Sequence, residues 1–221
     1  MPTSPQVTVV SVNYRTPDLI TRAVRSFREY YPQTPLLLID NGSGDDSVDH
    51  LMALQAAHPE CTDLVLNTEN RHHGPAMDQA LRTVDTPLVL FLDSDIVVRR
   101  HGFVAGMTSA LADVPHSYAT GKRIWMNRRG FDVEESAGGT PYIRPICMML
   151  RRQVYLSLPP FRRHGAPCLE NMRAAHQQKL QLVPFPIEDF IDHDGRGTAG
   201  RHGYHLGLRG KINHLLNVMG V

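Results

Sequence analysis

Short apolar runs alternate with longer amphipathic stretches over the first 98 residues of the chain. Val7–Val12 reads VTVVSV, a continuous β-branched run that is typical of a strand buried on both faces. The sequence predicts further strands at Leu36–Ile39, Leu64–Leu66 and Leu88–Leu92. Because strands that alternate with helices form βαβ units, this pattern predicts an α/β fold with a mostly parallel central sheet and helices on both faces.

Helical patterns fill the intervals between these predicted strands. Residues 16–18 read Thr-Pro-Asp, which offers a helix start, and apolar residues recur at helical spacing over Leu19–Phe27. Two more helices are expected over Asp46–Ala57 and Pro75–Val84. Each of the first three predicted strands is therefore followed by a predicted helix, as the α/β interpretation requires.

The pattern becomes less regular after Asp95, where glycine, proline and arginine residues interrupt it. Strand-like segments lie at Tyr118–Ile124, Ile143–Leu150 and Leu182–Phe185, and a helical stretch covers Leu169–Lys179. We expect these segments to extend the sheet that the first part of the chain begins.

A single domain with two halves, residues 1–98 and residues 99–221, is expected for a chain of 221 residues. The second half ends in a loop and a predicted helix, because the apolar residues of Ile212–Met219 fall on one helical face. We expect this helix to pack on the body of the protein. A lid or a helix lying on a membrane surface is the alternative.

Composition narrows the class of protein. With 42% hydrophobic residues, a chain of this length needs no disulfide for stability. Cys61, Cys147 and Cys168 form neither an even set nor a CxxC pair, which favours a reducing compartment, and the cytoplasm is the expected location. No apolar run approaches the roughly 20 residues of a membrane helix, and MPTSPQ does not resemble a signal peptide, so neither membrane spanning nor secretion is expected.

The net charge of +1 conceals an asymmetry between the two parts of the chain. Residues 1–95 carry 13 acidic and 6 basic side chains, whereas residues 96–221 carry 9 acidic and 17 basic ones. The basic part suits phosphates, an anionic acceptor or an anionic membrane surface, and the acidic part argues against a general nucleic-acid binder. Solvated faces of opposite charge remain the simpler interpretation.

Asp93 and Asp95 follow the most hydrophobic predicted strand, and Ser94 alone separates them. A divalent cation such as Mg²⁺ or Mn²⁺ would relieve the repulsion between two such carboxylates, since both ions prefer oxygen ligands and bridge to substrate phosphates. Carboxylates that cap a turn are the alternative. The pair therefore makes an Asp-x-Asp metal site a hypothesis that needs support from the surrounding motifs.

Four segments together resemble the family 2 glycosyltransferases, which have the GT-A fold. They are, in order, VTVVSVNYRTPDLITRAVRSF, LLLIDNGSGDDS, NRHHGPAMDQAL and LFLDSDIVV. The resemblance is close over residues 7–98 and looser through PPFRRHGAPCLENM to FIDHDGRGT. It implies a metal-dependent, inverting transfer of a sugar from a nucleoside-diphosphate donor to a hydroxyl of a glycan or glycoconjugate acceptor, with Mn²⁺ or Mg²⁺ as the cofactor.

The resemblance also assigns residues to the donor. The first half would bind the nucleotide sugar, and Asp40 would accept a hydrogen bond from the ring NH of uracil or thymine, which favours a UDP or dTDP donor. Turn capping by Asp40 and simple packing by Tyr14 are the alternatives. The residues expected in the nucleotide pocket are Asn13, Tyr14, Asp40, Asn70, Arg71, His73, Gly74, Asp78, Asp93 and Ser94.

The metal and the diphosphate complete this implied site. By the resemblance, Asp95 binds the metal directly, Asp93 reaches it through water or faces the ribose, and His193 is a further candidate ligand. Arg196 and Arg201 are candidate diphosphate contacts, although exposed arginines in a basic segment need no such role.

The general base is expected in the second half, residues 99–221, which would bind the acceptor. Inverting transfer needs a carboxylate within reach of the acceptor hydroxyl. Family members carry a Glu-Asp pair at the start of the helix after the acceptor loop, but this chain has Glu188 and Asp189 further along. We rank Glu170 first and Asp189 second as the catalytic base, and a helix-start charge or a surface acid is the alternative for each.

Three other functions remain in competition. A catalytically decayed protein that binds nucleotides or carbohydrates would explain the displaced Glu-Asp pair. A sugar-phosphate nucleotidylyltransferase has a similar fold but carries a glycine-rich loop where this chain reads Asn-Tyr-Arg-Thr at residues 13–16. A glycosidase needs no nucleotide pocket. The expected acceptor is a glycan or a lipid-linked molecule. The protein is expected to act in the cytoplasm or at the inner face of the membrane. The oligomeric state is left open.

Overall fold

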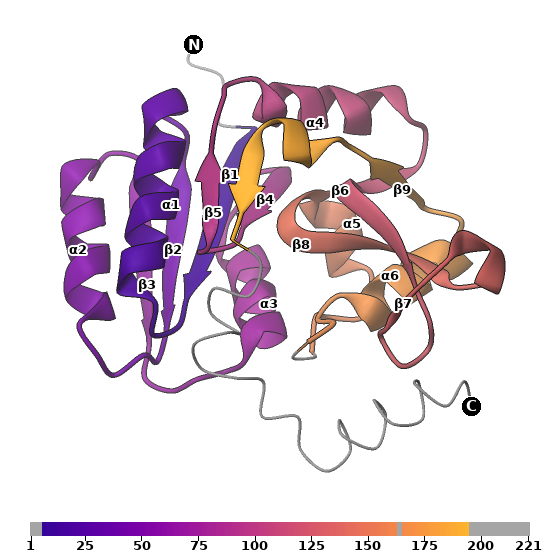
Figure 1. The fold of residues 1–221 in the computed structure, drawn as a ribbon, viewed down its shortest axis with the longest axis horizontal. Coiled ribbons are helices and arrows are strands. Elements are labelled where there is room, and N and C mark those ends of the chain that lie inside the picture. Colours follow the sequence, from indigo (N-terminus) through magenta and orange to yellow (C-terminus); the bar gives the residue numbers. More distant parts are fainter. Residues whose placement is uncertain (1–5, 163–164, 195–221) are drawn as a thin grey trace.

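The computed structural model describes residues 6–162 and 165–194 (Figure 1). Strands and helices alternate up to β4, as the apolar pattern predicts. In chain order the elements, with η for 3₁₀ helices, are β1 (Val7–Asn13), α1 (Pro17–Tyr30), β2 (Leu36–Asn41), α2 (Ser47–Ala57), β3 (Thr62–Asn67), α3 (His73–Thr83), β4 (Leu88–Leu92), β5 (Ile96–Val98), α4 (Phe103–Asp113), β6 (Ser117–Met126), β7 (Asp132–Val133), η1 (Glu135–Ala137), β8 (Thr140–Arg151), α5 (Arg152–Leu156), α6 (Leu169–Gln177), β9 (Gln181–Pro184), η2 (Ile187–Asp189) and β10 (Ile191–His193).

The central sheet has the strand order β3-β2-β1-β4-β8-β6-β7, and β9 pairs with β6 outside this path. Strands β1 to β4 are parallel to their neighbours, with β1 between β2 and β4. Strand β8 lies between β4 and β6 and runs antiparallel to both. The expected α/β fold with a mostly parallel sheet is confirmed, and the later strands supply its antiparallel part.

Alternate residues of the central strands face two separate hydrophobic cores. In β1, Val9 packs in the core with Phe27 of α1, whereas Val10 packs in the core with Met77 of α3. Helices α1, α2 and α4 therefore cover one face of the sheet, and α3 and α6 cover the other (Figure 1). All residues of β4 are buried, which explains why its sequence is continuously apolar.

Helix α4 and the two-stranded sheet of β5 and β10 were not predicted. In α4, Phe103, Met107 and Leu111 are buried at intervals of four residues, so a helical signal was present in the sequence. Strands β5 and β10 have three residues each, and they pair although they are far apart in the sequence. Local sequence patterns do not predict such a pairing.

The cysteines agree with the sequence-based expectation. Cys61, Cys147 and Cys168 are all free, and the last two are buried. Among the described residues, no helix combines the length and the apolarity that crossing a bilayer requires. The helix predicted over Ile212–Met219 lies outside the residues that the structure describes.

Candidate functional site

The candidate site lies at the edge of the sheet where β1, β2 and β4 end. These strands are parallel neighbours, so their carboxyl ends meet at the same edge. Asn13 ends β1, Asp40 lies near the end of β2, and Asp93 directly follows β4. Open α/β sheets bind their ligands at this edge, because the loops there leave a crevice.

Asn13 and Asp40 share a buried hydrogen-bond network. Asn13 Nδ2 donates to Asp40 Oδ1 at 3.1 Å, and Ser43 donates to the Asp40 carboxylate through its backbone N (2.9 Å) and its Oγ (2.5 Å). Asp40 is only 2% exposed. Its carboxylate caps the turn after β2 because it accepts both bonds from Ser43. A carboxylate has about four acceptor positions. Among the described residues, Asn13 and Ser43 use three of them, and Oδ2 keeps capacity for one more donor.

Tyr14 lies at the rim of this network. Its neighbour Arg15 places its guanidinium carbon 5.3 Å from the centre of the Tyr14 ring and donates from Nε to the Ser43 carbonyl at 2.9 Å. Arg15 has a φ of 55°, and His72 on the facing loop has a φ of 67°. Non-glycine residues in this region are strained and concentrate at functional sites, so both loops have the character of binding loops.

Asn41 joins the turn after β2 to the loop after β3, a role that was not predicted from the sequence. Its Nδ2 donates to Asn70 Oδ1 at 3.1 Å. Its Oδ1 accepts from Asn67 Nδ2 and from the Arg71 backbone N, both at 3.2 Å. Asn70 and Arg71, which were predicted to line the nucleotide pocket, are exposed on this loop and held in place by Asn41. A run of polar residues at the end of a buried strand is the signal that could have identified Asn41.

Gly42 allows these two loops to approach closely. It has a φ of +72°, and a Cβ atom added there would lie 2.3 Å from the Glu69 carbonyl carbon. Gly44 has a similar φ of +67°, but a Cβ added there would meet no atom within 4 Å. Substitutions at both glycines would strain the backbone conformation, but only a substitution at Gly42 would also cause a clash with another backbone segment. Comparing the two positions therefore distinguishes these two contributions to stability.

We expect Gly42→Ala to lower the free energy of unfolding more than Gly44→Ala does. Both changes place a side chain at positive φ, which costs roughly 1 to 3 kcal/mol, but only Gly42→Ala also forces the loop at Glu69 to move. Urea unfolding of the two variants and the wild type measures the difference. Equal stability of the two variants would contradict the close approach of the loops.

His73 and Gly74 begin α3 beside Asp93. The His73 Nε2 atom lies 3.8 Å from Asp93 Oδ1, and Gly74 is buried in the first turn of the helix. Burial lowers the pKa of His73 to about 4, against the opposing effect of the Asp95 charge. The imidazole is therefore neutral at neutral pH, and its contact with Asp93 is not an ion pair.

Asp78 was predicted to line the nucleotide pocket, and the structure engages its carboxylate elsewhere. Tyr155 donates its hydroxyl to Asp78 Oδ1 at 2.6 Å, and Arg82 Nε lies 3.0 Å from Asp78 Oδ2. The same Tyr155 hydroxyl accepts the backbone N–H of Phe161 at 3.1 Å. Through these bonds, Asp78 ties α3 to the chain segment that follows β8.

Asp93, Asp95 and His193 converge although almost a hundred residues separate the histidine from the two carboxylates. Each offers one ligand atom, and these atoms lie within 4.8 Å of one another. The pairing of β5 with β10 places His193 opposite Ile96, and the Asp194 backbone N–H donates to the Asp95 carbonyl at 3.1 Å. As a result, His193 Nε2 lies 3.2 Å from Asp95 Oδ1. The three predicted metal ligands are thus brought together.

The electrostatics of this cluster favour a cation. Burial, together with the Asp95 charge, raises the pKa of Asp93 to about 7, and the bond to Asp95 raises the pKa of His193. The Asp93 side chain is 27% exposed, so water screens part of the repulsion between the carboxylates. Two carboxylates and one imidazole match the ligand preferences of Mn²⁺ and Mg²⁺, and a bound cation would remove the need for a proton at Asp93.

The remaining residues predicted to contact the donor are Ser94 and the two arginines Arg196 and Arg201. Ser94 is 5% exposed between the two carboxylates. Arg196 and Arg201 lie outside the described residues, which end at Asp194.

Glu170 and Asp189 lie on two different elements of the second half. Glu170 is half-buried in the first turn of α6, whereas Asp189 ends the 3₁₀ helix η2 and is exposed. Burial raises the pKa of the Cys168 thiol, and the Asp93 charge adds to this shift.

A hairpin tip packs beside the start of α6. A Cβ added to Gly130 would lie 3.2 Å from Ala166 Cβ and 3.6 Å from Leu169 Cδ2, so the turn between β6 and β7 contacts the residues that begin α6. On β6, Trp125 is half-buried with the Arg123 guanidinium 5.9 Å from its ring centre.

Solved structures of similar fold identify the fold of this protein. The mannosyltransferase PcManGT from Pyrobaculum calidifontis, in complex with GDP-Man and Mn²⁺, superposes with a TM-score of 0.66 at 18% identity, over 84% of this chain and 56% of that one. The glucosyl-3-phosphoglycerate synthase from Mycobacterium tuberculosis, in complex with Mg²⁺ and UDP, gives 0.63 at 17% identity, over 99% and 80%. S. aureus TarS 1-349 in complex with UDP-GlcNAc gives 0.57 at 14% identity, over 84% and 57%. These likenesses show that the fold is that of the GT-A glycosyltransferases.

The family follows from a match of sequence. The model of glycosyl transferase family 2 matches residues 8–164, which is more than half of the chain, and the protein belongs to this family. A comparison with curated protein sequences finds no significant match. The chain spans between half and two thirds of the length of the mannosyltransferase and of TarS 1-349.

Proposed function

We propose that this glycosyltransferase is metal-dependent and inverting, and that it moves a sugar from a nucleoside-diphosphate donor to a hydroxyl of a glycan, glycoconjugate or lipid-linked acceptor. The observation that carries the proposal is the convergence of Asp93, Asp95 and His193 at the edge where Asn13 and Asp40 end their strands. Family membership supports glycosyl transfer. Relatives of the same fold hold Mn²⁺ or Mg²⁺ together with GDP-Man or UDP.

The donor would bind to the half formed by residues 1–98, with UDP or dTDP as the nucleotide. Asp40 Oδ2 has capacity for one further donor, and the ring NH of uracil or thymine supplies one. The proposed lining of the nucleotide pocket is Asn13, Tyr14, Asp40, Asn70, Arg71, His73, Gly74, Asp78, Asp93 and Ser94. Asp78 contributes to this pocket only through the position of α3, since Tyr155 and Arg82 engage its carboxylate.

Asp95 and His193 would hold the cation directly, and Asp93 would reach it through water or bind the ribose. When bound, Mn²⁺ or Mg²⁺ offsets the negative charge that grows on the departing diphosphate. Arg196 and Arg201 are the proposed further donors to this diphosphate. His73, which is neutral at neutral pH, lies 3.8 Å from the Asp93 carboxylate, too far for a direct hydrogen bond.

The acceptor would bind to the half formed by residues 99–221. Glu170 is the proposed base that takes the proton from the acceptor hydroxyl as its oxygen attacks the anomeric carbon. Attack from the face opposite the diphosphate inverts the configuration at this carbon. Trp125, with the Arg123 guanidinium near its ring, would stack on a sugar of the acceptor.

The proposed place of action is the cytoplasm, at the inner face of the membrane if the acceptor is lipid-linked. The retained cluster of Asp93, Asp95 and His193 disfavours a decayed protein. The segment Asn-Tyr-Arg-Thr after β1, at residues 13–16, disfavours a nucleotidylyltransferase, because that class needs a glycine-rich loop there.

Thermal unfolding with a panel of nucleoside diphosphates, each with Mn²⁺ and with chelator, tests the donor site. Ligand at about 100 times its Kd stabilises the folded state by roughly 2.7 kcal/mol, which raises the Tm of a chain of this length by about 5 to 10 °C. We expect this rise with UDP or dTDP, and we expect the chelator to remove it. The absence of a rise with every nucleotide would contradict the proposed donor site.

A further inference from the structure

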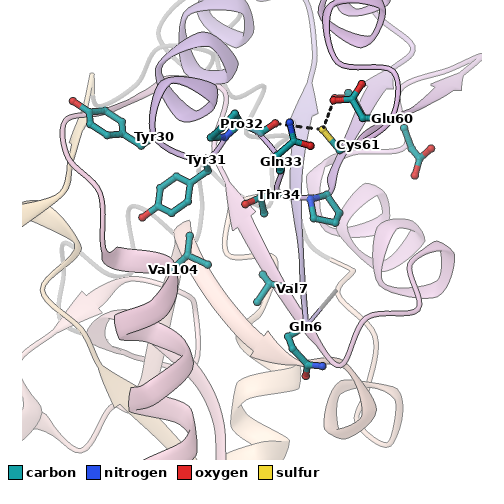
Figure 2. Close-up of a pocket in the computed structure, with 13 residues that line it drawn as sticks. Gln6, Val7, Tyr30, Tyr31, Pro32, Gln33, Thr34, Glu60, Cys61 and Val104 are labelled. Carbon is teal, nitrogen blue, oxygen red and sulfur yellow. Dashed lines mark hydrogen bonds between the residues drawn. The ribbon is translucent and has the colours of Figure 1, made fainter. Parts of the chain in front are cut away.

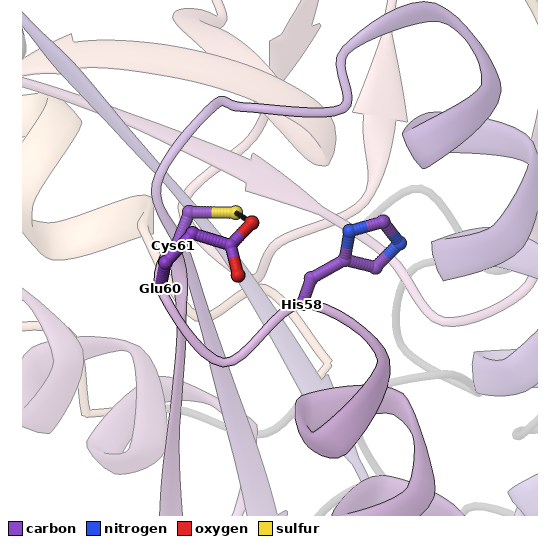
Figure 3. Close-up of side chains that lie close together, drawn as sticks. All are labelled: His58, Glu60 and Cys61. Carbon is purple, nitrogen blue, oxygen red and sulfur yellow. Dashed lines mark hydrogen bonds between the residues drawn. The ribbon is translucent and has the colours of Figure 1, made fainter.

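A second group of potential metal ligands lies in the connection between α2 and β3. His58, Glu60 and Cys61 each offer one ligand atom, and the three atoms lie within 4.8 Å of one another (Figure 3). His58 caps the carboxyl end of α2, and Cys61 immediately precedes β3. The proposed donor site uses none of these residues.

The backbone that carries these three side chains is held in a defined turn. The Cys61 backbone N–H donates to the His58 carbonyl at 3.2 Å, which closes a four-residue turn with Pro59 at its second position, where proline is favoured. The buried Arg28 donates from NH2 to the Cys61 carbonyl at 3.0 Å, and Leu36 N donates to the same carbonyl at 2.9 Å. The ligand atoms therefore start from a backbone that hydrogen bonds hold in place.

The donor set differs in chemistry from that of Asp93, Asp95 and His193. A thiol, an imidazole and a carboxylate match a borderline-soft cation such as Zn²⁺, which binds sulfur, nitrogen and oxygen with tetrahedral geometry. Mg²⁺ prefers oxygen ligands. The Cys61 thiol donates to the Pro32 carbonyl, 3.4 Å from Sγ, and also faces Glu60 Oε1 at 3.7 Å. Binding of the cation breaks this bond and releases the thiol proton to solvent.

An open pocket gives an ion access to this group. Glu60 and Cys61 line a cavity of about 750 Å³ together with residues 30–35 and Val104 (Figure 2). Three protein ligands leave the fourth position of a tetrahedral ion to water, and the pocket offers space for that water. Cys147 and Cys168, by contrast, are buried in the two cores and offer no such access.

The two groups of ligands lie at opposite ends of the sheet. Cys61 is at the amino end of β3, whereas the donor site is at the carboxyl edge. The six residues of β3 span roughly 20 Å at about 3.3 Å per residue. An ion at His58, Glu60 and Cys61 would therefore tie α2 to β3 and would not touch the transferred sugar.

We propose that His58, Glu60 and Cys61 form a site for Zn²⁺ that is separate from the donor metal. Titration of the full chain with Co²⁺, as a coloured substitute for Zn²⁺, tests this directly, because a cobalt–thiolate bond produces a near-ultraviolet charge-transfer band. The band is expected in the wild type and in Asp95→Asn, since the donor site contains no sulfur. It should be absent from Cys61→Ser, and excess Zn²⁺ should remove it from the wild type.

Zn²⁺ should also raise the Tm of Asp95→Asn by roughly 5 to 10 °C at about 100 times its Kd, and the double variant Asp95→Asn/Cys61→Ser should show no rise. The Asp95→Asn background removes the contribution of the donor metal from this measurement. A wild-type protein without the Co²⁺ band, or a band that persists in Cys61→Ser, would overturn the site. Loss of nucleotide binding has no bearing on either readout, so the two proposals fail independently.

Discussion

Replacement of Asp95 by alanine is expected to lower turnover by at least about a thousandfold. A bound cation supplies several kcal/mol of stabilisation to the departing diphosphate, and each 1.4 kcal/mol corresponds to roughly tenfold in rate. Asp95 is the proposed direct ligand that both Asp93 and His193 approach. Steady-state assays with a matched donor and saturating Mn²⁺ measure the loss.

The fold should survive this change. The alanine removes one of two crowded carboxylates, so the ion-free Asp95→Ala protein should unfold at the same temperature as the wild type or at a higher one. Asp192→Ala is the matched control, because Asp192 is an exposed carboxylate on β10, the strand that carries His193, and it pairs with Arg99. Wild-type activity in Asp95→Ala, or equal losses in both variants, would rule out Asp95 as a metal ligand.

Glu170→Gln is expected to lower transfer by about a hundredfold to ten-thousandfold while leaving donor binding unchanged. Glutamine keeps the size of the side chain but takes no proton from the acceptor hydroxyl. Glu170 is half-buried in the first turn of α6. Single-turnover transfer and the nucleotide-induced shift in Tm separate the chemical step from donor binding.

Asp189→Asn is the natural comparison for this second prediction. Asp189 is an exposed acid at the end of η2, and its neighbour Glu188 pairs with Lys122 at 2.5 Å. We expect Asp189→Asn to retain most of the activity. If Asp189→Asn is inactive and Glu170→Gln is active, the base is Asp189 and our ranking of the two carboxylates is wrong.

The first half of the fold was accessible from the sequence because its signals are local. Buried parallel strands must be apolar on both faces, so β1, β2 and β4 appear as continuous apolar runs that are easy to locate. The parallel arrangement then implies that Asp40 and Asp93 share one edge. The free cysteines and the absence of a disulfide framework also follow from composition and spacing.

The fold of the second half was harder to predict from the sequence than that of the first half. Beyond Asp95, strand β8 lies between β4 and β6 and runs antiparallel to β4. The periodicity of apolar residues predicts a strand but does not predict which strands become its neighbours. Helix α4 was missed although its buried residues are regularly spaced, because Gly102 and Gly106 interrupt the local pattern.

By itself, the sequence determined an α/β protein with a pair of carboxylates at the end of a buried strand, since strand burial and residue order are local properties. The tertiary structure alone decided which distant residues join them. His193 reaches Asp95 only because β10 pairs with β5, and Asp78 is held by Tyr155 only because α3 packs beside the segment after β8. Such contacts depend on backbone pairing and packing between segments far apart in the chain, and these are settled only when the whole core assembles.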